Sequence, residues 1–338
     1  MISAPTDIRD QLEAKTDDEL LSHSLRVGQW QQFHGQNEIK NALQIAIDAT
    51  KQRKESLDHT LLYGPPGLGK TTLSQLIAKE LGVNFTMTSG TALAKTGDLA
   101  SILTNLQDGD VLFIDEIHRL PKAVEETLYP VMEDYALDIV IGKGPSARTV
   151  RLDLPKFTLI GATTRFGLLT GPFRDRFGLI HRLEFYDADG LASIIEHAAK
   201  RLSISIDHAA ALSLAKRSRG TPRIALKLLK RVRDVAQLQG VEHIIIKHVE
   251  AALDMYRIDV LGLYQSDRQL LETLITKHGG GPVGLSTLAT TLHEDQGTVE
   301  EVIEPYLIQI GFLQRTAQGR VVTPNAYSHL GLPYPART

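Results

Sequence analysis

Hydrophobic residues follow two different spacings in the first part of the chain, up to about residue 186. Short continuous apolar runs, such as those at 111–114 and 157–162, alternate with segments whose apolar residues recur every three or four positions. The runs are typical of strands buried on both faces, and the wider spacing is typical of amphipathic helices. This alternation predicts an α/β fold, a parallel sheet flanked by helices.

The same pattern predicts the individual elements of this part. We expect strands at 61–63, 84–88, 111–114, 157–162 and 181–186, helices at 38–50, 98–106 and 125–135, and one more helix ending near Leu81. Residues 137–154 alternate apolar and polar positions on both sides of a Gly-Lys-Gly-Pro turn, which predicts a β-hairpin.

Beyond residue 186 the pattern changes. From 191 to 255 only helical spacing is found, without a clear strand, which predicts a small all-α domain. From about residue 266, helical patterns interrupted by a flexible glycine-rich segment precede a β-hairpin within 311–323, as in a winged helix. We therefore expect three domains, at 1–186, 187–257 and 258–338.

Composition narrows the class of protein. A chain of 338 residues is too long for one ordinary core and fits two or three domains. It has no cysteine, no apolar run near the ~20 residues of a membrane span and no secretory signal pattern, so we expect a cytoplasmic protein that does not enter membranes. A net charge of −3 gives no overall attraction to nucleic acid, so any DNA contact needs a local basic patch.

The stretch LLYGPPGLGKTT, at 61–72, carries the strongest chemical signal. Gly67 and Gly69 have no Cβ to obstruct a phosphate, and the helix that follows presents its positive N-terminus to the same anion. Lys70 would reach the β- and γ-phosphates, and the Thr71 hydroxyl would bind Mg²⁺. These features predict a nucleotide-binding P-loop, whose adenine side would be lined from just upstream by Leu25, Arg26, Trp30 and Phe33.

Acidic residues follow the strand predicted at 111–114. Asp115 and Glu116 stand at its carboxyl end, the edge at which open α/β sheets bind ligands. We expect Asp115 to hold Mg²⁺ through water and Glu116 to polarise the water that attacks the γ-phosphate. His118 completes a helicase-like DEIH string, but it is as readily interpreted as surface structure.

Other positions can act on the γ-phosphate. The strand at 157–162 ends in Thr163 and Thr164, where a polar side chain can lie between phosphate and water. The segment GPFRDRFG offers Arg174 and Arg176. An arginine there either pairs with Asp175 or reaches into a neighbouring subunit as an arginine finger, a group worth about 10³ to 10⁵ in rate. Arg223 follows a Thr-Pro pair that begins a helix, so it is fixed where it could couple hydrolysis to domain rotation.

The predicted hairpin is a candidate partner surface. Ile139, Val140 and Ile141 would face solvent if the hairpin protrudes, and an exposed apolar tip usually marks an interface. The alternative, an edge hairpin packed on its own domain, stays open.

The winged-helix segment is a candidate DNA surface. Its third helix carries Glu300, Glu301 and Glu304 and no basic residue, so phosphates would repel it and base reading is not expected. Arg315 and Arg320 flank the tip of the hairpin and suit sequence-independent phosphate contact. A winged helix that contacts only protein is the alternative.

Taken together, these segments resemble the RuvB family of AAA+ ATPases from about Arg26 to Leu332. The matching strings occur in one order: GPPGLGKTTL, GDLASILTNL, DVLFIDEIHRL, LYPVMEDY, LDIVIGKGPSAR, FTLIGATTR, RDRFG, HRLEFY, GTPR and GFLQRTAQGR. The resemblance implies an AAA+ domain, a small all-α lid domain and a C-terminal winged helix. It implies an ATPase that forms a homohexameric ring around duplex DNA and moves a Holliday junction held by RuvA, with RuvC joining indirectly in a resolvase complex.

The resemblance also implies roles for single residues. By motif match, Lys70 and Thr71 are Walker A, Asp115 and Glu116 are Walker B, Thr164 rather than Thr163 is sensor 1, Arg176 is the finger acting in trans and Arg223 is sensor 2. Further contacts to ATP or ADP are implied for Leu25, Arg26, Gly67, Thr72, Glu133, Asp134, Tyr135 and Tyr186. Arg315 and Arg320 correspond to DNA contacts, and Ile139, Val140 and Ile141 to the docking site for RuvA.

The chain departs from the family pattern at Val27 and Thr91, where proline is common, and at Ala94, where an acidic residue is common. These changes could alter the adenine lid or subunit packing, but they remove no group that the chemistry needs. Two rival interpretations remain. One is an ATPase that loads or remodels proteins and needs no DNA wing; the other is an ATP-gated winged-helix regulator, whose recognition helix should be basic.

Overall fold

The computed structural model describes residues 27–141 and 148–334, without side-chain placements for Val140 and Ile141. The chain divides into two units. The first contains the described residues up to Arg201 together with Gly220–Leu226. The second contains Leu202–Arg219 and the described residues from Lys227 on. In the described ranges, no helix is both long enough and apolar enough to cross a membrane.

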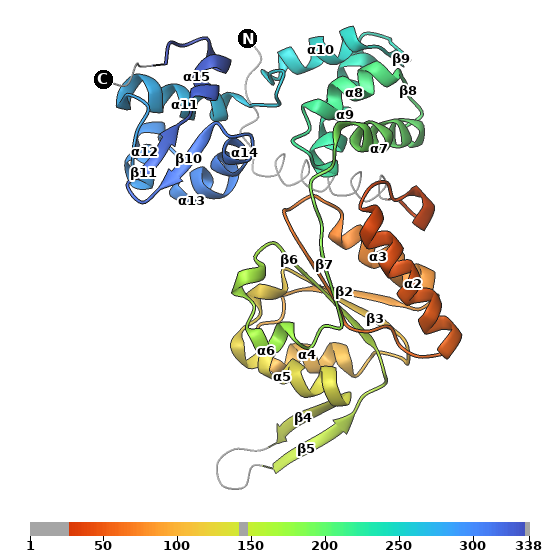
Figure 1. The fold of residues 1–338 in the computed structure, drawn as a ribbon. Helices are drawn as coiled ribbons and strands as arrows, with labels where there is room; N and C mark the ends of the chain where they lie inside the picture. The colour runs from red at the N-terminus through yellow and green to blue at the C-terminus, as the bar shows by residue number, and fades with distance from the viewer. Residues whose placement is uncertain (1–26, 142–147, 335–338) are drawn as a thin grey trace. The chain divides into compact units, whose positions relative to one another are not determined.

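The first unit is built on a five-stranded sheet in the order β2-β3-β6-β1-β7 (Figure 1). Its strands are β1 (Thr60–Tyr63), β2 (Phe85–Ser89), β3 (Val111–Asp115), β6 (Thr158–Thr163) and β7 (Leu179–Arg182). Every neighbouring pair is parallel. Because β3, β6 and β1 are adjacent, the residues that follow these three strands meet at one edge of the sheet.

Helices cover both faces of this sheet. One face carries α2 (Asn37–Arg53) and α3 (Lys70–Leu81), and the other carries α4 (Thr96–Leu103) and α5 (Lys122–Asp134). Leu61 packs with the α4 and α5 side and Leu62 with the α2 and α3 side, because successive strand residues point to opposite faces. Both side chains are fully buried, as the continuous apolar runs predict. Further elements of the unit are η1 (Trp30–Gln32), η2 (Ile117–Arg119), η4 (Phe166–Leu168), α6 (Gly171–Arg174) and α7 (Ala188–Arg201).

The last strand of the sheet differs from the prediction. The strand expected at 181–186 begins two residues earlier and ends at Arg182. The apolar alternation continues past the strand because Leu183 is buried beside the P-loop and the Tyr186 hydroxyl donates to the carbonyl of Leu68 at 3.4 Å. The apolar spacing at 181–186 therefore reflects two things, the end of the strand and the packing of the residues after it against the P-loop.

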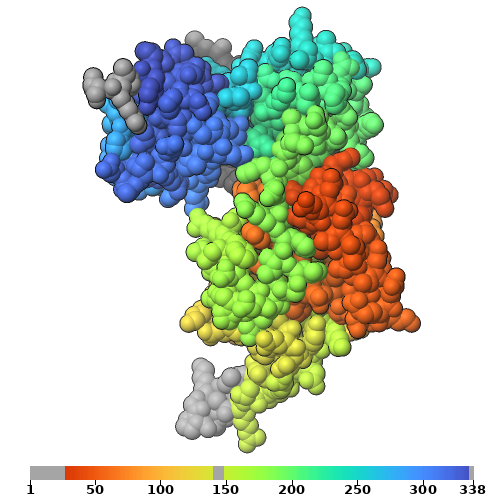
Figure 2. Space-filling model, in the orientation of Figure 1, coloured from red at the N-terminus to blue at the C-terminus, as the bar shows by residue number. Residues whose placement is uncertain are grey.

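The predicted hairpin is present as β4 (Ala136–Ile141) and β5 (Arg148–Asp153), which pair antiparallel along their whole length. The hairpin projects from the first unit (Figure 2). Its Val150 side chain is exposed. Leu137 is buried, and Ile139 packs half-buried against the core under α4 and α5. The prediction of a solvent-facing Ile139 is therefore wrong, because this residue belongs to the anchored part of the hairpin. The side chains of Val140 and Ile141 lie outside the described residues.

The second unit begins with a helical part. It contains α8 (His208–Lys216), most of α9 (Pro222–Leu238) and α10 (Ile246–Met255), with a parallel pair of two-residue strands, β8 (Ser205–Ile206) and β9 (His243–Ile244). The prediction of no strand between 191 and 255 is thus wrong, since two-residue strands are too short to produce an apolar periodicity.

The second unit ends in the winged helix. Its elements are α11 (Gln265–His278), α12 (Leu285–Leu292), α13 (Gln296–Thr298), the π-helical η5 (Val299–Ile303), α14 (Glu304–Gln309), β10 (Leu313–Thr316), β11 (Gly319–Val322) and a final helix that the pattern did not predict, α15 (Pro324–Leu330). The glycine-rich segment is not the flexible connection that was expected. Gly280 donates to the carbonyl of Leu274 at 2.8 Å and accepts from Val322 at 2.9 Å, so it lines the hairpin as part of the fold.

A buried histidine makes the stability of the first unit depend on pH. The Nδ1 of His59 accepts from the backbone N–H of Leu159 at 2.9 Å, so its Nε2–H donates to the carbonyl of Met132 at 3.0 Å. Burial lowers the pKa of His59, although the Met132 hydrogen bond and the charge of Asp58 raise it. The folded state therefore binds this proton less readily than the unfolded state. Its contribution to stability is complete above the ordinary pKa near 6.5 and is lost as the pH falls through the lowered value.

We expect the free energy of unfolding to fall below about pH 6.5, by at most about 1.4 kcal/mol per pH unit for this one histidine. His59→Gln, which keeps a donor and an acceptor but does not titrate, should make that slope shallower. Urea unfolding at pH 7 and pH 5.5 measures it, with the exposed His243→Gln as the matched control. Equal slopes for the wild type and His59→Gln would refute the assignment.

Candidate functional site

The P-loop has the backbone that phosphate binding requires. Gly67 and Gly69 have φ values of +81° and +100°, in the region that favours glycine. A Cβ on Gly67 would lie 2.9 Å from the Cβ of Arg223, and one on Gly69 would lie 3.2 Å from the ring of Phe33. Gly69 is also the N-cap of α3, so the loop ends at a helix N-terminus with its positive dipole end.

Lys70, the first residue of α3, supplies a buried charge to this loop. Its Nζ donates to the carbonyls of Gly64 at 2.8 Å and Pro65 at 2.9 Å, and the residue is only 7% exposed. Burial lowers the pKa of Lys70, while the charges of Glu116 and Asp115 raise it. A desolvated ammonium near two carboxylates, within an anion-binding loop, is suited to contact a polyphosphate.

The catalytic carboxylate predicted from the sequence lies beside Thr164. The Oε2 of Glu116 accepts from the Thr164 hydroxyl at 3.0 Å and from the Thr164 backbone N–H at 3.3 Å. Thr163 is fully buried, and its hydroxyl lies 2.9 Å from the Nδ1 of His118. Of the two threonines at the carboxyl end of β6, Thr164 is the one that holds Glu116. Glu116 itself has φ +46°, an uncommon conformation for a residue other than glycine, of the kind that concentrates at functional sites.

His118 is a site residue that the sequence interpretation missed. Its side chain is only 7% exposed and its Nδ1 lies 3.1 Å from the Oε2 of Glu116, so the surface interpretation is wrong. Burial lowers the pKa of His118 more than the charge of Glu116 raises it, which favours a neutral ring. The DEIH string was the one available signal, since it places His118 in the turn directly after the two acidic residues.

An apolar pocket adjoins the P-loop on the side where adenine was expected. Residues from four parts of the first unit line it, among them Val27, Phe33, Leu68, Thr72, Tyr186 and Pro222. Burial raises the pKa of Tyr186 to about 12, so its hydroxyl stays protonated. Trp30 lies in the core instead, and Leu25 and Arg26 fall outside the described residues. Val27, a departure from the family pattern, lines this pocket, whereas Thr91 and Ala94 are exposed.

Arg223 approaches the P-loop through its backbone. It is the second residue of α9, and its N–H donates to the carbonyl of Gly67 at 3.3 Å. Its side chain is exposed. The expected helix start at Thr221 and Pro222 is observed, so this arginine is held at the phosphate-binding loop.

The residues present fit a nucleoside triphosphate with Mg²⁺. The backbone of the loop leaves no room for a Cβ at Gly67, and among the described residues the buried Lys70 ammonium has only carbonyl groups within hydrogen-bond distance. Thr71 stands in the first turn of α3, and Asp115 ends β3 at the same edge of the sheet. A hydroxyl and one carboxylate are the donor set that Mg²⁺ commonly takes beside phosphates.

Four other predicted nucleotide contacts lie at the opposite edge of the sheet. The Tyr135 ring is 6.0 Å from the ring of His59, which precedes β1, and Arg176 precedes β7. Arg176 and Glu133 form an ion pair of 3.1 Å. Strands of four to six residues are roughly 13 to 20 Å long, so this edge is out of reach of a nucleotide held by the same chain's P-loop.

The opposite-edge cluster has partners of its own. The guanidinium of Arg176 lies 4.2 Å from the centre of the Tyr129 ring, and its Nη1 donates to the carbonyl of Pro172 at 2.5 Å. Asp134 pairs with Arg151 of the hairpin at 2.8 Å. The alternative pairing of Arg176 with Asp175 is therefore not observed, since Glu133 holds the guanidinium.

The two wing arginines share one buried partner. Arg315 and Arg320 occupy opposite positions on β10 and β11, and both guanidinium groups pair with Glu304, at 2.8 Å and 2.7 Å. The Glu304 side chain is fully buried and that of Arg320 is 14% exposed, whereas that of Arg315 is 43% exposed. The interpretations that Glu304 faces phosphates and that the hairpin presents Arg320 to solvent are therefore wrong. Arg315 is the one of the two arginines that is open to a phosphate.

This arrangement predicts unequal roles for the two arginines in stability. Removing one partner of a buried ion pair costs about 3 to 5 kcal/mol, whereas an exposed pair is worth about 1 kcal/mol or less. Arg320→Ala should therefore destabilise the winged helix by several times more than Arg315→Ala, which leaves Glu304 paired. Urea unfolding of the two variants compares them directly, and equal losses would contradict the buried-pair reading.

Comparisons with known proteins cover almost the whole chain. Residues 25–183 match the Holliday junction DNA helicase RuvB P-loop domain, 186–259 the RuvB AAA lid domain and 260–331 the RuvB C-terminal winged helix domain. Among solved structures, the Thermotoga maritima RuvB Holliday junction branch migration motor is 49% identical, with a TM-score of 0.82, over 92% of this chain and 100% of that chain. A single-substitution mutant of the same protein is 50% identical, with a TM-score of 0.83, over 92% and 99%.

Proposed function

Since the chain belongs to the RuvB family of P-loop ATPases, we propose that it is an ATP-driven motor that moves Holliday junctions along duplex DNA in recombination and repair. The observation that carries the ATPase part is the Glu116 carboxylate, held by Thr164 at the same sheet edge as the buried Lys70 of the P-loop. A nucleotide-binding site that merely sensed ATP would not need a carboxylate positioned for water.

Each side chain of the site has its own role in ATP hydrolysis. Glu116 orients the water for in-line attack, and Thr164 holds the carboxylate that does so. Lys70 contacts the β- and γ-phosphates and stabilises the charge that develops on them. Mg²⁺, held by Thr71 and through water by Asp115, would neutralise charge on the same oxygens. The apolar pocket with Phe33 and Tyr186 takes the adenine.

A closed ring follows from the two edges of the sheet. Arg176, Glu133, Asp134 and Tyr135 lie too far from their own P-loop to serve it, so they serve a neighbour's nucleotide. Each subunit then offers its P-loop edge to one neighbour and its Arg176 edge to the other, a head-to-tail contact that closes into a ring. We take the ring to be a hexamer, with domains at 1–186, 187–257 and 258–338.

The remaining assignments concern partners and location. The wing contacts the DNA backbone through Arg315, since its guanidinium is the accessible one of the pair. The projecting hairpin, with the exposed Val150, is the docking surface for RuvA, and RuvC joins through the same junction complex. The motor works in the cytoplasm, where a DNA-acting member of this family meets its substrate.

Strand separation of a labelled synthetic four-way junction tests the proposal. We expect separation with RuvA, ATP and Mg²⁺, and none with Lys70→Ala in place of the wild type. If ATP is hydrolysed while the junction stays intact, the ATPase assignment survives, branch migration falls and an ATPase that loads or remodels proteins takes its place.

A further inference from the structure

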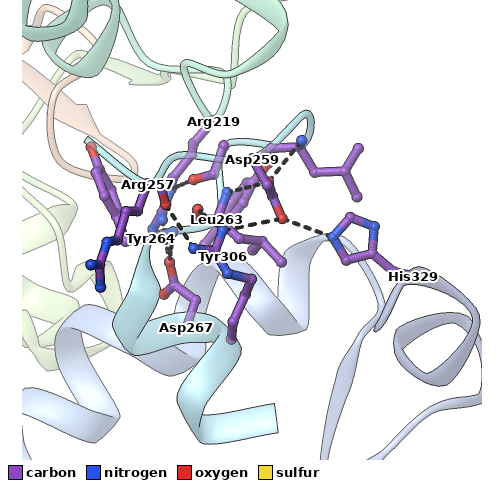
Figure 3. Close-up of polar contacts among 11 residues, drawn as sticks. Arg219, Arg257, Asp259, Leu263, Tyr264, Asp267, Tyr306 and His329 are labelled. Carbon is purple, nitrogen blue, oxygen red and sulfur yellow. Dashed lines mark hydrogen bonds and ion pairs between the residues drawn. The ribbon is translucent and has the colours of Figure 1, made fainter. Parts of the chain in front are cut away.

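Arg219 is a buried arginine of the second unit with several polar and aromatic contacts, and the nucleotide site does not use it. It stands at the end of the lid segment that follows α8, with φ +53°, and its side chain is only 9% exposed. The ring of Tyr264 lies 4.4 Å from its guanidinium carbon and that of Tyr306 lies 4.5 Å from it (Figure 3). One planar cation is thus placed against two aromatic rings of the winged helix.

Hydrogen bonds fix the orientation of this guanidinium. Its Nε donates to the carbonyl of Gly262 at 2.9 Å, and its Nη2 pairs with Asp267, whose side chain is 2% exposed. The same Asp267 carboxylate accepts from the N–H of Tyr264 at the start of α11. Arg219 therefore contacts the connecting segment, α11 and α14 at once, since Tyr306 belongs to α14.

The segment between the helical part and the winged helix is held in place as well. The Oδ1 of Asp259 accepts from the N–H groups of Leu261 and Leu263 at 2.9 Å and 2.8 Å, and its Oδ2 pairs with His329 of α15 at 2.8 Å (Figure 3). The Tyr306 hydroxyl donates to the carbonyl of Leu261. The connection is thus bonded along its length and does not have the contacts of a free hinge.

A short piece of chain joins Arg219 to the nucleotide site. The chain passes from the second unit to the first between Arg219 and Gly220. Gly220 accepts from the N–H of Tyr186 at 2.9 Å, and Arg223 donates to Gly67 of the P-loop. Four residues span at most about 14 Å when extended. No long linker therefore separates Arg223 from Arg219, and a displacement of Arg223 is passed on to Arg219.

We propose that Arg219 is a pin, a fixed contact that fastens the lid segment following α8 to the winged helix, so that movement begun at Arg223 is passed to the DNA-binding wing. The pin itself rests on the contacts of the second unit. Its consequence for DNA movement rests on the proposed function. Buried ion pairs add little net stability, and their best-attested use is to set one arrangement over others.

Distances between spin labels test the pin without any DNA or ATP. The chain has no cysteine, so Lys247→Cys on α10 and Glu272→Cys on α11, both exposed, give one clean pair of labels. We expect a narrow distance distribution in the otherwise wild-type protein and a clearly broader one with Arg219→Ala. The exposed Lys216→Ala, three residues away, is the matched control and should change nothing. An equally narrow distribution with Arg219→Ala would overturn the pin.

A coupling measurement then tests its consequence. We expect Arg219→Ala to keep its ATP turnover in the absence of DNA but to lose about tenfold in junction movement per ATP, which is typical of a lost coupling free energy. Wild-type movement per ATP in this variant would overturn the coupling. If the wild type itself moves no junction, the proposed function fails, and the label distances still decide the pin.

A more conservative variant covers the case in which Arg219→Ala does not fold. Arg219→Lys keeps the charge beside Asp267 but has no planar group to place against the two rings. If Arg219→Ala does not fold, Arg219→Lys decides: a broader distribution with unchanged basal ATP turnover supports the pin, and wild-type distances with wild-type movement per ATP overturn it.

Discussion

Replacing Arg176 with alanine in every subunit is expected to lower ATP turnover by about 10³- to 10⁵-fold, the range known for arginine fingers. The expected loss is this large because the group acts on the charge of the transition state and not on ground-state binding. ATP affinity should change much less than turnover. Steady-state turnover, together with the binding of a fluorescent nucleotide, separates the two quantities.

Mixing two inactive variants shows whether Arg176 acts across the subunit interface. Lys70→Ala removes the phosphate contact of a subunit's own site, and Arg176→Ala removes the group offered to the next one. If both groups complete the same site from different chains, some interfaces in a mixed ring contain an intact pair, and activity should return in proportion to them. No recovery at any mixing ratio would refute action in trans, as would an unchanged rate for Arg176→Ala alone.

Those parts of the site whose residues are close in sequence were predictable from the sequence. Lys70 follows a short apolar strand and a glycine-rich turn, so strand, loop and helix are all encoded within a dozen residues. Asp115 and Glu116 follow β3 directly, and parallel strands bring their carboxyl ends together whatever the intervening loops contain. The parallel sheet covered on both faces was predictable for the same reason, since β1, β3 and β6 are continuous apolar runs.

Pairings between residues far apart in sequence were not predictable. His118 is in contact with Thr163, 45 residues away, and nothing in the residues next to His118 indicates that contact. Arg219 pairs with Asp267 across 48 residues, and nothing local distinguishes it from the other arginines of its segment. In the wing, sequence reasoning treated the charges of Glu304 and Arg320 as separate, although each neutralises the other inside the fold.

Glu116→Gln is expected to lower ATP turnover by about 10² to 10⁴, the usual contribution of a positioned general base, while ATP still binds. Glutamine keeps the size of the side chain and its contact with the Thr164 hydroxyl, but it cannot accept a proton from water. Single-turnover hydrolysis measures the chemical step, and nucleotide binding measured on the same sample provides the control. A variant that hydrolyses ATP at the wild-type rate would remove Glu116 from the mechanism.

The two threonines at the carboxyl end of β6, Thr163 and Thr164, offer a matched test of how that carboxylate is held. Thr164→Val removes the 3.0 Å hydrogen bond to Glu116 without changing the shape of the side chain, so turnover should fall while ATP affinity stays the same. Thr163→Val removes the contact with His118 and the 3.0 Å hydrogen bond from the N–H of Arg165, but it leaves the hydrogen bond between Thr164 and Glu116 in place, so its effect on turnover should be smaller. The reverse order would make Thr163 the sensor of the γ-phosphate. His118→Gln tests whether the histidine also positions Glu116. If this variant lowers turnover as far as Thr164→Val does, His118 and Thr164 position the carboxylate together.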